Sequence, residues 1–569
     1  MRLRLAIQRI VLDESFDDTF ILEDIAHVPG YNRQFEDWCG DISGRYIGAL
    51  ALCSTYVDAD YSQLHRVASA ISQHQRPTGL IGTDQPEETV DLPVAWGQGR
   101  LLVGLLEYHS IFPSDELLAC ASRLGDYYIR TKHVWGEPAL RRRRAYVCYT
   151  QALEGLVALY RATGRDEYLT VAQHIAGWVP NDVAGEESVS SDTFGPTGRH
   201  SHGYMLSLIG MLALYEQTGD EALLQFVEDK CSQIRDRMLF VDGSPPELFP
   251  WSERDEGCST ADWLTLNLCL GRCTGEARCF EMAERVWRNA LYGNQAANGG
   301  FCHHHFAPYG FSGEGCEAWW CCSYHGPRAF HTLLRHLVTW DETGIQIQFL
   351  EPGEVDVPMP SGPIRISQRT EYPSQGYAEI EVQGGPEQGV PLSIRIPSWA
   401  HVEAVQHNGT PADAHIDSGY LRLAEPVRNG DIVTVRFPYG VRLGHGPERP
   451  ETLWYGPLLL AVEIPGGVAQ SVVVPPADGG GTIPLPALRA SNRPFTVPGA
   501  HFLIAGAGTP HAEPFESLSL NRPQLGSLRP LSEQTACAAL PPAVVKLPVV
   551  VADTELLQTE LRRVLQGRV

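Results

Sequence analysis

At 569 residues and 62.7 kDa the chain is several times longer than a typical domain, so we expect at least two compact cores. Its 43% hydrophobic and 20% charged residues exclude a disordered or fibrous protein. The 44 basic and 68 acidic residues give a net charge of −24, which repels nucleic-acid phosphates and anionic lipid surfaces. We therefore expect neither nucleic acid nor membrane as a partner, and a neutral or cationic small molecule instead.

The first ten residues start with basic side chains, but Gln8 and Arg9 interrupt their apolar part. This pattern is not that of a signal peptide. The longest apolar run, near 458–462, is too short to cross a bilayer. We expect a cytoplasmic location with reduced thiols.

Residues up to about 340 show repeated amphipathic helices. Residues 159–169 and 214–224 share one helix–Gly–helix pattern, in which Gly164 and Gly219 are placed as left-handed C-caps. Hairpins of this kind cannot bury their apolar faces singly, so they must stack or close into a ring. Long loops between them favour a closed (α/α)6 barrel over an open solenoid. Apolar positions at helical spacing mark 44–57, 97–112, 149–162 and 203–218.

After residue 340 the apolar positions alternate, with Gly, Pro or Asn turns between the segments. The chain is therefore a multidomain α + β protein. We expect a barrel over 1–340, whose first 25 or so residues could join a sandwich, a β-sandwich over 341–465, and a further β segment over 466–569. The alternating segments are 344–349, 377–382, 392–396 and 432–437.

Eight of the fourteen cysteines lie between Cys258 and Cys322. Glu256 with Cys258, and Cys321 with Cys322, offer three sulfur donors and one oxygen donor, a set that suits Zn²⁺. The alternative is that these cysteines are buried core thiols, which we favour for Cys269, Cys273 and Cys279. Cys302 with His303, His304 and His305 is a rival metal site, although three consecutive histidines converge poorly and are more typical of a rim loop.

Several short motifs occur in order along residues 40–465. In the helical part they are Glu256–Trp263 (EGCSTADW), Thr274–Glu276, Glu284-Arg285, Asn289–Leu291, Cys321-Cys322 and Gly326–Arg328. In the strands they are Arg395–Ala400 (RIPSWA), Asn408-Gly409, Gly419-Tyr420, Gly430-Asp431 and Tyr455–Leu458. Together they resemble glycoside hydrolase family 127, the β-L-arabinofuranosidase family of zinc- and cysteine-dependent glycosidases.

The resemblance implies an (α/α)6 barrel with attached β-sandwiches and a retaining exo-glycosidase. Its substrate would be a terminal β-L-arabinofuranoside or related sugar on a small oligosaccharide. Carried over to this chain, Cys321 is the nucleophile, and Glu256, Cys258, Cys321 and Cys322 hold Zn²⁺. A bound metal lowers a thiol pKa, so the thiolate forms at neutral pH without a base.

The general acid departs from the family pattern. The family places a catalytic Glu sixteen residues before the Glu that binds zinc, and that position is Phe240 here. Glu247 keeps family-like surroundings and Asp242 lies nearby, so both are candidates. By default each is a solvated loop carboxylate.

In a closed barrel the inner-helix N-termini surround one mouth, where sugars stack on aromatic faces. Candidate substrate-binding residues at such places are Trp38, Trp96, Tyr149, His200 and His202, of which His202 best matches the family, although each alone could be structural. Two substrate-contacting histidines of the family fall near Arg100 and Tyr149, which leaves the sugar open.

Two other functions, and the oligomeric state, stay open. The chain could be a sugar-binding or structural descendant that keeps zinc without hydrolysis. A sugar epimerase or lyase on the same barrel would need His or Tyr bases rather than a Cys₃Glu metal site. A homodimer is also left open.

Overall fold

The computed structural model describes most of the chain up to residue 465 and three short strands beyond it. The described residues are 1–26, 38–89, 91–134, 146–184, 200–250, 252, 254–296, 298–304, 318, 321–359, 362–446, 449–465, 482–483, 501–504 and 544–548.

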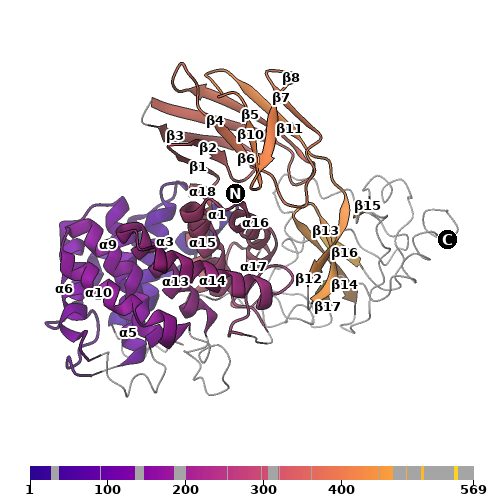
Figure 1. Cartoon of the computed structure of the whole chain (residues 1–569). Helices are drawn as coiled ribbons and strands as arrows, with labels where there is room; N and C mark the ends of the chain where they lie inside the picture. Colours follow the sequence, from indigo (N-terminus) through magenta and orange to yellow (C-terminus); the bar gives the residue numbers. More distant parts are fainter. Residues whose placement is uncertain are drawn as a thin grey trace.

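The helical part is a closed ring of inner helices covered by outer helices, and it lies below the first two sheets in the view of Figure 1. Among the described residues, six inner helices contact one another in sequence, and the last contacts the first. The expected (α/α)6 barrel is confirmed. The inner helices are α3 (Asp41–Cys53), α5 (Leu92–Ile111), α9 (Leu153–Thr163), α13 (Ser201–Thr218), α15 (Gly257–Thr274) and α18 (Cys322–Arg335).

Outer helices cover this ring, and each buries one stripe of apolar side chains against it. Each follows its inner partner in the chain, except that the first helix, α1, packs on the last inner helix, α18. The outer helices are α1 (Arg2–Leu12), α4 (Ser62–Gln73), α6 (Asp115–Thr131), α10 (Asp166–Ala176), α14 (Glu221–Arg237) and α16 (Ala277–Arg285).

Short helical segments complete the barrel. The first 26 residues are helical and pack on α18, α3 and α4, so they belong to the barrel rather than to a sandwich. No helix among the described residues has the length and apolar character needed to span a membrane. The short segments are η1 (Glu14–Phe16), α2 (Asp18–Ala26), α8 (Tyr146–Tyr149), η2 (Thr150–Ala152), η3 (Val179–Val183), η4 (Val286–Leu291) and α17 (Tyr292–Asn294).

Helices α3 and α5 cross at unusually close range. A Cβ atom added at Gly104 would lie 2.0 Å from the carbonyl oxygen of Gly44, so glycine is needed at this crossing. The close approach holds the N-terminal half of α3 against α5.

Two sheets form the sandwich that follows the barrel. Their facing sides share one core of buried Ile, Val and Leu, as in Ala378, Ile380 and Val382 of β5. The four expected strand segments are all present. One sheet has the order β1 (Val338–Asp341), β2 (Gly344–Ile347), β6 (Leu392–Arg395), β10 (Tyr420–Leu423), β9 (Ala414–Asp417). The other has β3 (Gly353–Met359), β4 (Gly362–Thr370), β5 (Tyr377–Gly384), β11 (Ile432–Arg436), β7 (Ala404–His407), β8 (Thr410–Pro411).

A third sheet follows the sandwich. Its strands after residue 465 pair with β12 and β14, and the rest of 466–569 lies outside the described residues. Its order is β15 (Thr482–Ile483), β12 (Val441–Gly446), β13 (Arg449–Tyr455), β14 (Leu458–Pro465), β16 (His501–Ile504), and β17 (Val544–Pro548) also pairs with β14.

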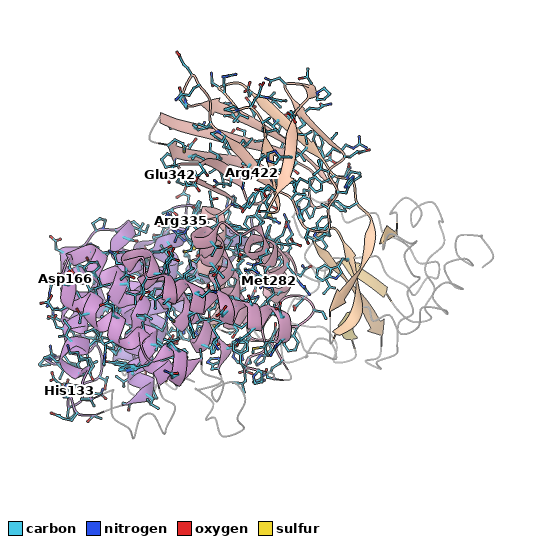
Figure 2. All side chains as sticks on the ribbon, in the orientation of Figure 1. His133, Asp166, Met282, Arg335, Glu342 and Arg422 are labelled. Atoms are coloured by element: carbon cyan, nitrogen blue, oxygen red, sulfur yellow. The ribbon has the colours of Figure 1, made fainter. Side chains whose placement is uncertain are left out.

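A buried ion network joins the barrel to the sandwich. Glu284 on α16 accepts from Arg395 of β6 at 2.6 Å and from Arg288 at 3.0 Å, and Arg288 also pairs with Glu351. The side chains of Glu284, Arg288 and Arg395 are each at most 3% exposed. Breaking a pair of this kind leaves an uncompensated buried charge. Figure 2 shows the junction of the two parts, marked by Arg335 at the end of α18 and Glu342 between β1 and β2.

We expect Arg395→Met to destabilise the protein by roughly 3–5 kcal/mol, because Glu284 loses a buried partner. The matched control is Arg365→Met on β4, whose ion pair with Asp356 is exposed to solvent and should contribute little to stability. Urea unfolding midpoints of the full chain measure both effects. Equal shifts for the two variants would show that the network does not hold the two parts together.

Candidate functional site

The four predicted metal ligands meet at the start of two neighbouring inner helices. Glu256 and Cys321 are the N-cap residues of α15 and α18, and Cys258 and Cys322 lie in the first turns. One ligand atom from each residue lies within 4.8 Å of all the others. The three thiols are free, and the Sγ atom of Cys322 lies 3.3 Å from that of Cys258 and 3.6 Å from that of Cys321.

This donor set fits the expected zinc ion. A tetrahedral Zn²⁺ with Zn–S bonds of about 2.3 Å places its sulfur ligands about 3.8 Å apart, close to the observed separations. Gly257 is required between two of the ligands, because a Cβ atom there would lie 2.3 Å from the carbonyl oxygen of Cys302. The donors therefore converge in a geometry that a small tetrahedral cation can fill.

The carboxylate of Glu256 is fixed by three neighbours. Its Oε2 accepts from Ser259 Oγ at 2.6 Å and contacts His200 Nε2 at 2.8 Å, while His303 Nε2 lies 3.7 Å from Oε1. Burial raises the pKa of Glu256, but these histidines hold it well below its usual value. Burial lowers the pKa of His303, but the hydrogen bond to Glu256 raises it to about 9. The Glu256 side chain is therefore held as a carboxylate anion.

The three thiols differ in exposure. Cys258 and Cys322 are 0% and 1% exposed, whereas Cys321 is partly exposed. Burial raises the pKa of all three, but hydrogen bonds from Cys258 and Cys322, with the charge of His303, hold the pKa of Cys321 well below its usual value. Negative charge thus concentrates on the sulfur that a substrate can reach.

Glu247 lies at the rim beside this cluster. Its backbone carbonyl accepts from Ser201 N at 2.9 Å, and the next residue pairs with His200. The Glu247 side chain is 19% exposed and accepts from Arg254 Nε at 2.7 Å through Oε2. A carboxylate oxygen of Glu247 also lies within 4.8 Å of His303 and His304.

Asp242, the other candidate acid, caps its own turn. Its Oδ1 accepts from the Ser244 backbone N–H at 3.0 Å and from the Ser244 hydroxyl at 2.7 Å. Burial raises the pKa of Asp242, and its charged neighbour is Arg285 at the end of α16. No hydrogen bond or ion pair within the described residues joins it to the thiols. Phe240, at the family's usual acid position, is buried where this turn begins.

Of the rival histidine site, His303 and His304 lie together beside Glu247, with ligand atoms within 4.8 Å of one another. His303 is partly exposed at the rim, as expected, but His304 is buried and contacts the carbonyl oxygen of Asp255 at 2.9 Å. Cys302 is disulfide-bonded and offers no thiolate, so the expectation that the thiols are reduced is wrong for this residue. His305 lies outside the described residues.

The aromatic candidates lie in two different parts of the barrel. Trp96 stacks on His200, with ring centroids 6.0 Å apart and planes 20° from parallel, and Trp38 meets its edge at 5.4 Å. These three side chains border the mouth beside Glu256. Tyr149 is instead fully buried between Tyr128 and Trp178, away from the cluster.

His202 lies beneath the mouth and is only 2% exposed. Its Nε2 contacts Arg45 at 2.9 Å, and its Nδ1 bonds to Asp262. Both ring nitrogens are therefore engaged within the protein, so His202 supports the floor of the site rather than presenting a polar atom to a sugar.

Sequence reasoning missed the roles of Arg45 and His325 in this floor. His325 lies four residues after Cys321, and Asp262 four residues after Cys258, so helical spacing alone places both beneath the thiols. Arg45 gives no such signal, because its partners are 157 and 280 residues away in the chain.

Comparisons with known proteins agree with this architecture. The sequence matches the family model for the GH127 β-L-arabinofuranosidase catalytic domain over residues 12–333, and that for the GH127 middle domain over residues 344–439. No curated protein matches it.

Solved structures share the fold. Ara127N-Se, a GH127 β-L-arabinofuranosidase from Geobacillus stearothermophilus T6, is similar with a TM-score of 0.68 and 17% identity, over 84% of this chain and 86% of that chain. A GH127 β-arabinofuranosidase gives 0.66 and 18%, over 81% of each chain. A structure described as a glycoside hydrolase gives 0.65 and 16%, over 91% of this chain and 96% of that chain.

The catalytic-domain match alone spans more than half of the chain, and it contains the Glu and Cys cluster. The structural likeness extends the shared fold through the sandwich. The chain therefore belongs to the GH127 β-L-arabinofuranosidase family and is a glycoside hydrolase.

Proposed function

We propose that this glycoside hydrolase is a retaining exo-enzyme that removes a terminal β-L-arabinofuranoside, or a related sugar, from a small oligosaccharide. The observation that carries the proposal is the partly exposed Cys321 within an otherwise buried Cys₃Glu cluster at the mouth of the barrel. The family supplies the sugar class, since solved relatives are described as β-L-arabinofuranosidases.

In the first step Cys321 Sγ attacks the anomeric carbon of the sugar. A C–S bond forms while the glycosidic C–O bond breaks, and the departing oxygen takes a proton from Glu247. Glu247 is favoured for this role over Asp242, because it lies at the rim among His303, His304 and Arg254. Arg254 Nε donates to Oε2 of this carboxyl group at 2.7 Å and so fixes the orientation of the side chain.

In the second step a water molecule replaces the sulfur. Glu247, now a carboxylate, takes a proton from this water, whose oxygen bonds to the anomeric carbon as the C–S bond breaks. Two displacements at one carbon return the original anomeric configuration. Both the thiolate and the acid are then restored.

Glu256, Cys258, Cys321 and Cys322 would hold Zn²⁺, which supplies a thiolate at neutral pH and fixes the sulfur in place. The buried pair Cys258 and Cys322 would anchor the ion from below. Trp96, Trp38 and His200 would border the bound sugar at the mouth.

Protein purified without chelator should contain about one zinc per chain, and Cys258→Ser should lose most of it, because one of the three sulfur donors disappears. Cys279→Ser is the control, since this free, buried thiol lies on the outer helix α16. Elemental analysis measures both variants. Absence of zinc, or equal zinc in Cys258→Ser and wild type, would remove the metal from the proposal.

A haloacetamide-bearing L-arabinofuranose mimic should alkylate Cys321 and leave Cys322 unmodified, because Cys321 is the thiol with partial exposure. Peptide mass mapping of the full chain locates the label, and excess L-arabinose should slow the labelling. Modification of Cys322, or of cysteines scattered over the chain, would contradict the nucleophile assignment.

Glu247→Gln should lower kcat/KM for substrates with poor leaving groups by roughly 10²–10⁴ while sparing activated aryl glycosides, because only the former need a proton. Asp242→Asn serves as the comparison, since Asp242 caps a turn and any effect should be equal on both substrates. Rates with paired leaving groups test this. Similar small losses for Glu247→Gln on both substrates would exclude it as the acid. If the wild type cleaves no aryl glycoside, a sugar-binding role becomes the better interpretation.

A further inference from the structure

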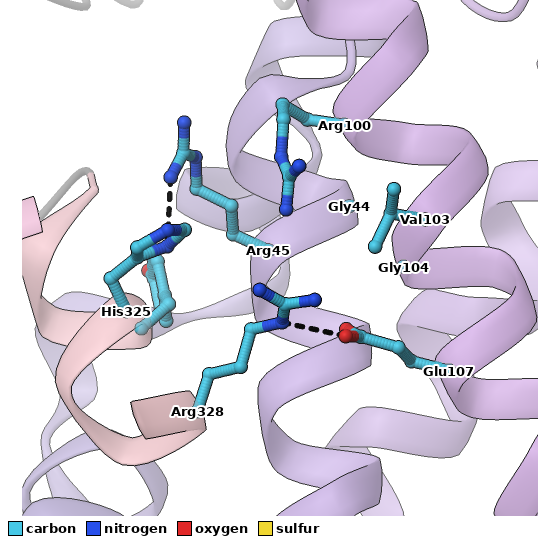
Figure 3. A pocket seen from close by; sticks show the side chains of 9 residues that line it. Gly44, Arg45, Arg100, Val103, Gly104, Glu107, His325 and Arg328 are labelled. Atoms are coloured by element: carbon cyan, nitrogen blue, oxygen red, sulfur yellow. Dashed lines mark hydrogen bonds and ion pairs between the residues drawn. The ribbon is translucent and has the colours of Figure 1, made fainter. Parts of the chain in front are cut away.

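A buried arginine lies directly beneath the candidate metal cluster. The side chain of Arg45, on α3, is 2% exposed, and it donates to Asp41 Oδ1 at 2.9 Å. It also contacts His202 Nε2 at 2.9 Å and His325 Nδ1 at 2.8 Å. Figure 3 shows the bond between Arg45 and His325 in the lumen of the barrel.

These contacts fix the protonation of both histidines. A guanidinium group only donates, so the ring nitrogens that face Arg45 must be acceptors. The opposite nitrogens then carry the hydrogens and donate to Asp262, from His325 Nε2 to Oδ1 at 2.8 Å and from His202 Nδ1 to Oδ2. Both imidazoles are therefore neutral, and burial lowers the pKa of each.

His202, Asp262 and His325 could hold a metal ion by composition, since their ligand atoms lie within 4.8 Å of one another. The positive group among them is instead the guanidinium of Arg45. We call the set of Arg45, His202, Asp262 and His325 the lumen knot.

The lumen knot joins the helices that carry the ligands. His325 lies one turn after Cys321 on α18, and its backbone N–H donates to the Cys321 carbonyl oxygen at 3.1 Å. Asp262 lies one turn after Cys258 on α15. His202 lies two residues after His200, which holds Glu256. The knot therefore connects α3, α13, α15 and α18 one turn beneath the cluster.

We propose that Arg45 is a positioning residue. The N–H donors of its planar guanidinium group set the spacing of the α15 and α18 N-termini, and this spacing sets the size of the gap between Glu256, Cys258, Cys321 and Cys322. This inference rests on the proposed metal centre. Partners that hold metal ligands in place typically change metal affinity by about 10- to 100-fold when they are removed.

The lumen offers a matched control. Arg100 of α5 is also buried, and it lines a small cavity that Arg45, His325, Glu107 and Arg328 also line. Its ion pair is with Glu154 at 3.6 Å, and within the described residues no contact joins it to the cluster. Arg100→Met thus removes a buried charge beside the lumen knot, and within the described residues it breaks none of the knot's hydrogen bonds or ion pairs.

The test compares wild type, Arg45→Met, Arg45→Lys and Arg100→Met as full-length proteins. Zinc affinity is measured by competition with a chromophoric chelator, ligand geometry by the absorption bands of the Co²⁺-loaded protein, and folding by the melting temperature of the metal-free protein. We expect Arg45→Met to weaken zinc binding by about 10- to 100-fold and to alter the cobalt bands.

Arg45→Lys separates an effect on the metal site from a general loss of folding, because it keeps the buried positive charge beside Asp41. A lysine ammonium cannot reproduce the planar fork, so this variant should also bind zinc more weakly than wild type. Arg100→Met should melt earlier while keeping wild-type affinity and cobalt bands. Wild-type affinity in both Arg45 variants, or an equal loss in Arg100→Met, would overturn the inference. Absence of zinc binding by the wild type would instead overturn the proposed metal centre.

Discussion

The positive ends of two helix dipoles are the physical feature on which the site depends. Glu256 and Cys321 cap α15 and α18, and Cys258 and Cys322 lie in the first turns, where unpaired backbone N–H groups favour negative charge. A charge at such a position is stabilised by about 0.3–1 kcal/mol, and thiol pKa values fall there. Because the inner helices close into a ring with their first turns at one end, the fold brings four candidate metal donors together at one mouth.

The lumen beneath this mouth is polar rather than apolar. Arg328 of α18 donates to Glu107 and Glu154 at 2.6 Å each, so it ties α18 to α5 and α9. Buried ion pairs add little net stability, because desolvation offsets their attraction. We infer that these pairs, like the lumen knot, act mainly by fixing which residues of adjacent inner helices face one another. If the inner helices were packed only by apolar contacts, one helix could shift along its neighbour by a fraction of a turn at a lower cost in free energy.

Much of the fold could be predicted from the sequence, because its signals are local. Helical spacing, the C-cap glycines Gly164 and Gly219, and the alternation after residue 340 each act within about ten residues. The convergence of Glu256, Cys258, Cys321 and Cys322 could also be predicted, since they occur in two short motifs. The contacts of Arg45 with His202 and His325 could not, because they arise only when helices far apart in the sequence become neighbours. The placing of Tyr149 differs from that expected for a similar reason: it precedes an inner helix, but its ring packs outward between Tyr128 and Trp178.

The segment 240–250 shows how counting along the sequence can mislead. Sixteen residues before Glu256 the chain has Phe240, which is buried at a tight turn closed by Asp242. Seven residues later the chain pairs with the start of α13, and this pairing brings Glu247 to the rim beside His303.

Counting sixteen residues back from Glu256 assumes that the chain between the acid and this Glu always has the same length. The position of an acid depends instead on which backbone segment passes the mouth of the barrel. Since the pairing with His200 sets that path, and His200 also contacts Glu256, one residue couples the approach of the candidate acid to the carboxylate of the Cys₃Glu cluster. A change in loop length can therefore move the acid along the sequence while leaving its place at the rim intact.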